Sequence, residues 1–90
     1  MATYLADTKE TELGIHANSR HLYDKIRCGI FNATNGRIKI SGIAISSIDT
    51  EFTYLLVADG KLTKAQLEYC RTMAQGIAIG CELEGQLHLA

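Results

Sequence analysis

Residues 28–44 read CGIFNATNGRIKISGIA, and the Asn35-Gly36 dipeptide within this stretch decides the fold that we expect. The type I′ turn of a two-residue β-hairpin needs positive φ at both central residues, and Asn followed by Gly tolerates this best. When residues are paired across such a turn, apolar side chains fall on one face of the ribbon and polar side chains on the other. The apolar face holds Phe31, Ala33, Ile38 and Ile40, and the polar face holds Asn32, Thr34, Arg37 and Lys39. The stretch therefore predicts a β-hairpin with strands at 28–34 and 37–44.

A helix is expected after this hairpin, at about residues 47–58. Residues 46–49 have the pattern of a capping box, and Asp59-Gly60 suits a helix end because Gly adopts the left-handed C′ conformation. Apolar residues recur at helical spacing between these signals, at Ile45, Ile48, Phe52, Leu55 and Leu56. The run 52–58 is also compatible with a buried strand, because its residue types occur readily in sheets. The capping signals favour the helix.

A second helix is expected at about residues 64–80. Thr63 as N-cap places Gln66 at N3, which completes a capping box, and Leu62 and Leu67 have the spacing of a hydrophobic staple. An apolar stripe then follows at helical spacing, comprising Leu67, Cys70, Ala74, Ile77, Ala78 and Cys81.

Three other segments are less sharply defined. Residues 82–89 partly alternate between apolar and polar, which is compatible with a closing strand, and residues 3–6 are compatible with another. Residues 18–27 fit either a helix that starts at an Asn18 or Ser19 cap or a long first strand of the hairpin.

These elements predict an α+β fold in a single domain, residues 1–90. A small antiparallel sheet is centred on the hairpin, and the two consecutive helices cover its apolar face. A mostly helical bundle that carries the hairpin is the alternative. The chain has no proline, and nothing in it resembles a linker.

Composition restricts the classes of partner. The formal net charge is −1, from nine basic and ten acidic residues, so no strong general attraction to nucleic acid or to an anionic membrane is expected. Three cysteines are too few and too widely spaced for a disulfide framework. The N-terminus shows no basic segment followed by an apolar one, and no apolar run approaches the length of a bilayer span. We therefore expect a cytoplasmic protein.

Motifs for catalysis, metals and cofactors are weak, so we expect no catalytic residue, no metal and no cofactor. His16, His21 and Cys28 are the only potential zinc ligands within a short span, but no cysteine pair accompanies them. In the expected hairpin Cys28 faces inward, and Cys70 and Cys81 are expected to be buried structural thiols. The glycines fit no phosphate-binding pattern.

Two sets of residues are candidates for binding. Arg27, Arg37, Lys39 and Asn32 would offer an anionic, nucleotide-like ligand a basic face on the hairpin, although a solvated face is the simpler interpretation. Nucleic acid is not favoured, because no aromatic side chain accompanies them for base stacking.

The second set consists of Ala74, Gly76 and Gly80 on the 64–80 helix. These small residues suit either close packing inside the chain or contact with a second copy, and open strand edges also favour self-association. The sequence thus favours a small, non-enzymatic homo-oligomer that acts by binding another protein. An oligomeric binder of a small anionic ligand is the alternative.

Overall fold

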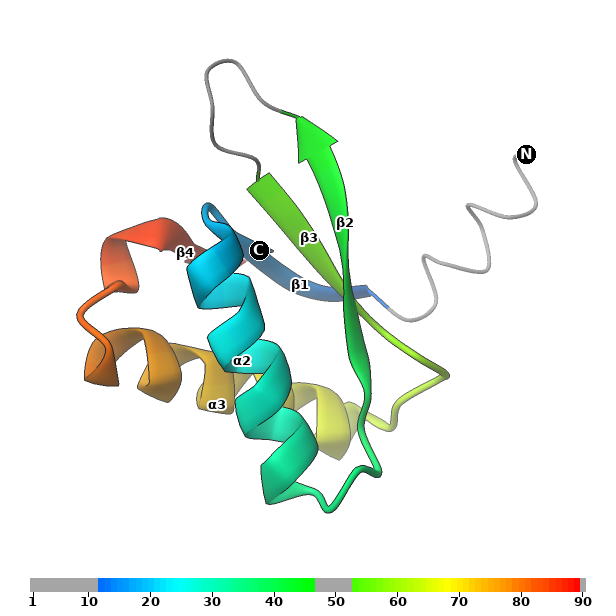
Figure 1. Cartoon of the computed structure of the whole chain (residues 1–90). Coiled ribbons are helices and arrows are strands. Elements are labelled where there is room, and N and C mark those ends of the chain that lie inside the picture. Colours follow the sequence, from blue (N-terminus) through cyan, green and yellow to red (C-terminus); the bar gives the residue numbers. More distant parts are fainter. Residues whose placement is uncertain (1–11, 47–52, 90) are drawn as a thin grey trace.

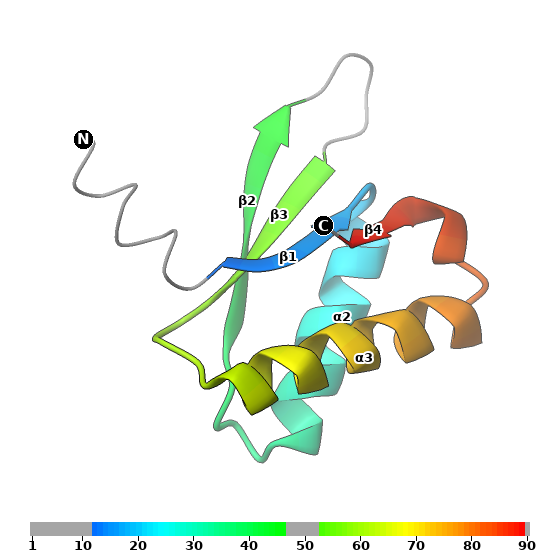
Figure 2. The same cartoon turned by 180° about the vertical axis from the view of Figure 1, so that it is seen from behind.

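The computed structural model describes residues 12–46 and 53–89. The elements in chain order are β1 (Glu12–Ala17), α2 (Arg20–Ala33), β2 (Ile40–Ser46), β3 (Thr53–Ala58), α3 (Lys64–Gly80), the 3-10 helix η1 (Glu84–Gln86) and β4 (Leu87–Leu89). The strands form one antiparallel sheet, and α2 and α3 pack on the same face of it (Figures 1 and 2). The predicted α+β class, with two helices over one sheet, is confirmed, and the mostly helical alternative is wrong.

The strand order in the sheet is β2-β3-β1-β4. Because every neighbouring pair is antiparallel, β1 runs parallel to β2 with β3 between them, and β3 runs parallel to β4 with β1 between them. Each helix thus connects two parallel strands and forms a βαβ unit with them, and one strand of the other βαβ unit lies between these two strands. This is the βαββαβ arrangement called ferredoxin-like, which hosts many unrelated functions and so assigns none by itself.

The predicted first strand of the hairpin, 28–34, is wrong, because these residues belong to helix α2 and to its C-terminal cap. Ser19 caps the helix, and its Oγ accepts a hydrogen bond from the Leu22 N–H at 3.2 Å. Leu22, Ile26 and Ile30 follow one another at helical spacing, and all three are fully buried. Of the two interpretations of 18–27, the helix is therefore the correct one.

Asn35 and Gly36 do have positive φ, 55° and 79°, but they end a helix instead of turning a hairpin. The Gly36 N–H donates to the Phe31 carbonyl at 2.8 Å, and the Asn35 N–H donates to the Asn32 carbonyl at 3.2 Å. This pair of bonds is a Schellman motif, with Asn35 at the left-handed C′ position. The same backbone conformation thus serves a different purpose from the one predicted.

The second predicted hairpin strand, 37–44, is partly correct, because β2 starts only at Ile40. Its partner in the sheet is β3 rather than 28–34. The predicted helix at 47–58 is wrong over 53–58, which form the strand β3, and 47–52 lie outside the described residues. β3 lies between β1 and β2, so pairing on both sides stabilises the strand that the local capping signals did not favour.

The second predicted helix, 64–80, is confirmed with the same bounds. Both bonds of its capping box are present, from the Gln66 N–H to Thr63 Oγ1 at 3.1 Å and from the Thr63 N–H to Gln66 Oε1 at 2.9 Å. Within 82–89, only Leu87–Leu89 form a strand, and it follows the 3-10 turn. Residues 3–6 lie outside the described part of the chain.

The core fills the space between the helices and the sheet. Ile38 and Ile40 are buried as expected, whereas Phe31, predicted to share their face, is 41% exposed. The buried side chains come from both helices, from alternate positions of the strands and, for Ile38, from the connection between α2 and β2: Leu13, Ile15, Ala17, Leu22, Ile26, Ile30, Ile38, Ile40, Leu56, Ala58, Cys70, Ala74 and Ala78. Of the helices that the structure describes, none is both long and apolar enough to cross a membrane.

One contact joins α3 to an irregularity in β1. Gly14 has a φ of 70°, and the register between β1 and β3 shifts between Glu12 and Ile15. Arg71 of α3 donates from Nη1 to the carbonyls of Leu13 and Gly14, at 3.0 and 3.1 Å. The guanidinium thereby pairs with carbonyls that the bulge leaves out of regular pairing.

Candidate interaction surfaces

The four predicted ligand-binding residues do not share a strand face, because the hairpin does not form. Arg27 and Asn32 lie on α2, whereas Arg37 and Lys39 lie on the exposed connection between α2 and β2. The Lys39 carbonyl accepts a hydrogen bond from the Asp59 N–H at 2.8 Å, which fixes the entry into β2. The basic face on which an anionic-ligand site was predicted is therefore absent.

Arg27 has partners on its own helix. Its Nη2 lies 3.6 Å from Oδ1 of Asp24, which also faces Arg20, and its guanidinium carbon lies 5.9 Å from the centre of the Tyr23 ring. These ion pairs are exposed, so each adds little stability. Tyr23 in turn stacks on Tyr54 of β3, with ring centres 5.3 Å apart and planes 8° apart.

A glycine of β2 makes room for this stack. A Cβ placed on Gly42 would lie 2.7 Å from Cε1 of Tyr23, which is closer than real contacts allow. The Tyr23 ring therefore rests directly on the β2 backbone and ties α2 to the sheet. The aromatic pair was not predicted, because residues 23 and 54 are far apart in sequence and nothing local marks them as neighbours.

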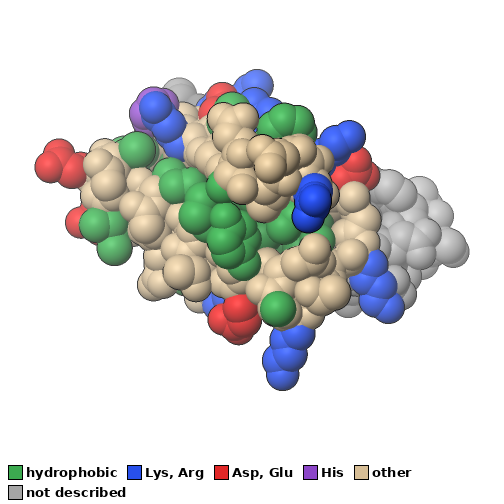
Figure 3. All heavy atoms as spheres, turned by 90° about the horizontal axis from the view of Figure 1, so that it is seen from below, with side chains coloured by type: hydrophobic (Ala, Val, Ile, Leu, Met, Phe, Trp, Pro, Cys, Tyr) green, Lys and Arg blue, Asp and Glu red, His purple; other side chains and the backbone are tan. Residues whose placement is uncertain are grey.

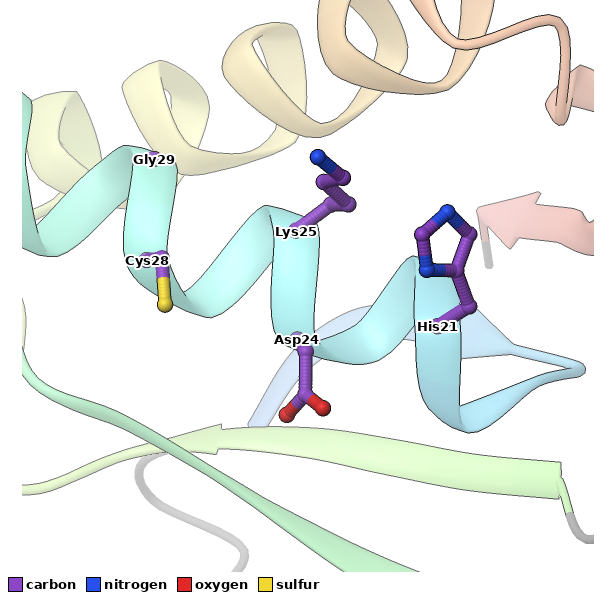
Figure 4. A pocket seen from close by; sticks show the side chains of 5 residues that line it. All are labelled: His21, Asp24, Lys25, Cys28 and Gly29. Atoms are coloured by element: carbon purple, nitrogen blue, oxygen red, sulfur yellow. The ribbon is translucent and has the colours of Figure 1, made fainter.

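An open hollow of about 430 Å³ lies along α2 and is lined by His21, Asp24, Lys25, Cys28 and Gly29. These five recur at helical spacing, so they form one stripe of the helix. Figure 4 shows that Asp24 and Cys28 point to one side of the helix, whereas His21 and Lys25 point to the other. The polar groups thus do not converge on a single point, as acid–base or nucleophilic catalysis would need.

The cysteines and histidines occupy places that differ from the predicted ones. Cys28 and Cys81 are exposed, so the predictions of an inward-facing and a buried thiol are wrong for these two. Cys70 is buried as predicted, and its removal from water raises the pKa of its thiol. Within residues 12–46 and 53–89, no three His, Cys, Asp or Glu side chains are placed to hold a metal ion.

The face of the sheet opposite the helices carries a row of side chains that the sequence did not reveal. Ile43, Leu55, His16 and His88 lie side by side across the four strands, since each is paired with the next. Asn18 connects the end of this row to β3, with Nδ2 3.1 Å from His88 Nε2 and with Oδ1 accepting from the Thr53 hydroxyl at 3.3 Å. Only the strand register brings these residues together.

The predicted self-association residues divide between the core and the surface. Ala74 is fully buried, so it faces the core and not a second copy. Gly76 and Gly80 are exposed, and a Cβ on either would meet nothing within 4 Å. Close packing inside the described chain, one of their two interpretations, therefore does not account for these glycines.

Ile79 lies beside the two glycines and is 61% exposed, the highest value among the large hydrophobic side chains of the described residues. Between Thr72 and Gly80 the helix has no charged residue. We call Gly76, Ile79 and Gly80 the α3 surface. Figure 3, the view from below onto the side where α3 lies in Figure 1, shows hydrophobic side chains near the middle, a Lys or Arg side chain beside them, and most other charged side chains toward the margin.

Comparison with known proteins adds no relative: no family model, no curated protein and no solved structure matches this chain.

Proposed function

We propose that the protein is a non-enzymatic interaction protein that forms a homo-oligomer and acts by binding another protein. The observation that carries this proposal is the α3 surface. A solvent-facing helix surface is normally rich in charge, whereas the cores of protein interfaces are depleted of it. The second half of α3 lacks charged residues, as the core of an interface does.

The glycines of the α3 surface strengthen the argument. A glycine inside a helix costs about 1 kcal/mol relative to alanine. Nothing in the described chain approaches Gly76 or Gly80 closely enough to exclude a larger residue there. A protein that packs against α3 explains why these positions are glycine, because two glycines one turn apart let another backbone come close.

A photo-crosslinking side chain in place of Ile79 tests whether the α3 surface contacts protein. The matched control carries the same group in place of Lys61, which is also exposed. We expect a covalent protein adduct from position 79 and little from position 61, in cells that express the protein. The mass of the adduct shows whether its partner is a second copy or a different protein.

Gly76→Ala separates an interface role from a purely structural one. The new methyl group has free space, so the isolated chain should gain roughly 0.5–1 kcal/mol of stability in denaturant unfolding. The same methyl group should lower the yield of the adduct at position 79. A stabilised variant with an unchanged yield, or no adduct at all from position 79, contradicts the proposal for this surface.

A further inference from the structure

The edge strand β2 lacks the usual protection of a sheet edge. Among the described residues it pairs with β3 alone, and its sequence, ISGIAIS, has neither a charged residue nor a proline. Natural edge strands commonly carry such residues, or a bulge, to prevent pairing with other chains. Here only the last part of the strand is irregular, between Ala44 and Ser46. The edge from Ile40 to Ala44 therefore remains regular.

The register shows which backbone groups of β2 point outward. Asp59 N–H donates to the Lys39 carbonyl, so Lys39 belongs to the set of residues that hydrogen-bond to β3. In an antiparallel ladder such residues alternate with residues whose N–H and C=O groups point away. Ser41 and Ile43 thus bond to β3, whereas Ile40, Gly42 and Ala44 direct their backbone groups toward the free edge.

We propose that two copies of the chain pair antiparallel through their β2 edges. Gly42 then lies opposite Gly42 of the second copy on the two-fold axis, and Ile40 lies opposite Ala44 at either end. The same three residues supply donors and acceptors in both copies, which is the self-complementarity that a two-fold interface needs. This inference rests on the self-association in the proposed function and assigns a surface to it.

The distribution of charge favours a second copy in this orientation. Lys39 is the charged residue that directly precedes β2. In the antiparallel pair it lies opposite Ile45 of the second copy, so the two Lys39 side chains are about 20 Å apart along the strands. That separation exceeds the Debye length of about 8 Å at physiological salt. A parallel pair would instead place the two lysines side by side.

Side-chain size also permits the approach. On the helix-facing side Ile40 is buried in the core of its own chain, and Gly42 and Ala44 carry no side chain larger than a methyl group. The Tyr23 ring already covers Gly42 and is fixed against Tyr54. On the opposite side Ser41 lies across from Ile43 of the second copy, so no charged side chains oppose each other there.

Amide hydrogen exchange resolved by residue tests the pairing. We expect the amides of Gly42 and Ala44 to gain protection as the protein concentration rises, while those of Ser41 and Ile43 are protected throughout. Free exchange of Gly42 and Ala44 at every concentration overturns the inference. Protection of these amides in a sample that sediments as a monomer also overturns it, because the edge is then occupied within a single chain.

Ser41→Lys tests the same β2 pairing by substitution. It places two like charges diagonally across the proposed axis and should weaken self-association at least about tenfold. Ala65→Lys, at an exposed position of α3, is the control and should leave association unchanged. Circular dichroism of both variants checks that they remain folded.

A third variant, Ile79→Lys, distinguishes the two proposals. If Ile79→Lys separates the copies and Ser41→Lys does not, self-association is correct and its assignment to β2 is wrong. If the unmodified protein is monomeric at all concentrations, the pairing and the self-association of the proposed function both fail.

Discussion

At the scale of single residues, Gly42 has no room for a side chain on β2. The ring of Tyr23 lies against Gly42 and is stacked on Tyr54, so it has little freedom to move away from a new side chain. We expect Gly42→Ala to lower the free energy of unfolding by about 1–3 kcal/mol, as overpacked positions do. Urea denaturation measures this loss.

Gly29→Ala is the control for that prediction. Its new Cβ would also lie 2.7 Å from a neighbour, but that neighbour is Cδ1 of Ile77, the tip of a flexible side chain. The helix gains about 1 kcal/mol from the replacement of glycine, so the variant should be neutral or slightly more stable. Equal losses from the two substitutions would contradict the role given to the Tyr23 ring.

The buried thiol of Cys70 predicts a dependence of stability on alkaline pH. Burial raises its pKa in the folded state, so the unfolded chain releases the proton at lower pH than the folded chain does. The stability due to this group is therefore complete below about pH 8.5, the ordinary thiol pKa, and declines as the pH rises above it. Cys70→Ala should remove this part of the decline, as judged by denaturant unfolding across that range. An unchanged slope would contradict the assignment.

Single residues in the sequence predicted the local backbone conformation correctly, but not the secondary structure to which that conformation belongs. Asn35-Gly36 correctly predicted two residues with positive φ. The same conformation, however, serves both type I′ turns and helix C-caps, and the dipeptide itself does not distinguish them. Leu22, Ile26 and Ile30 favour the helix C-cap, because they form a buried stripe at helical spacing before Asn35-Gly36.

At the scale of elements, α3 was fully predictable and α2 and β3 were not. The capping box at Thr63 and Gln66 is local, so the sequence alone defined where the helix begins. The residues of β3 are compatible with either structure, and two neighbouring strands from other parts of the chain decide between them. Information of this kind is not contained in an isolated segment.

Thiol labelling tests the assignment of α2 as a helix. Cys28 lies on its exposed side, whereas a hairpin strand over 28–34 would turn the thiol inward. We expect a thiol reagent to modify Cys28 and Cys81 rapidly in the native protein and Cys70 only on unfolding. Mass spectrometry of the labelled peptides identifies the sites. Slow labelling of Cys28 alongside Cys70 would contradict the helix.

At the scale of the whole molecule, the layers were predicted but the order of the strands was not. Two helices over one face of an antiparallel sheet were predicted, but one of the two was expected at 47–58 and is instead α2. The order β2-β3-β1-β4 depends on pairing between distant segments, such as His16 with His88. The two proposed surfaces differ in the same way. Gly76 and Gly80 were identified from their spacing in the sequence. The outward-facing backbone groups of β2 follow only from the strand register.

The whole-molecule view also connects the two proposed surfaces. β2 is one edge strand of the sheet, and the α3 surface belongs to the other βαβ unit, on a helix that packs against α2 and, within the sheet, mainly against β1. Pairing of two copies through β2 therefore leaves both α3 surfaces available to a different protein. In this arrangement one dimer presents two equivalent binding sites.

Sedimentation velocity over a wide range of protein concentration tests the central claim, self-association, most directly. We expect a species of twice the 9.9 kDa chain mass that becomes populated as the concentration rises. A single species at 9.9 kDa at every concentration would contradict it.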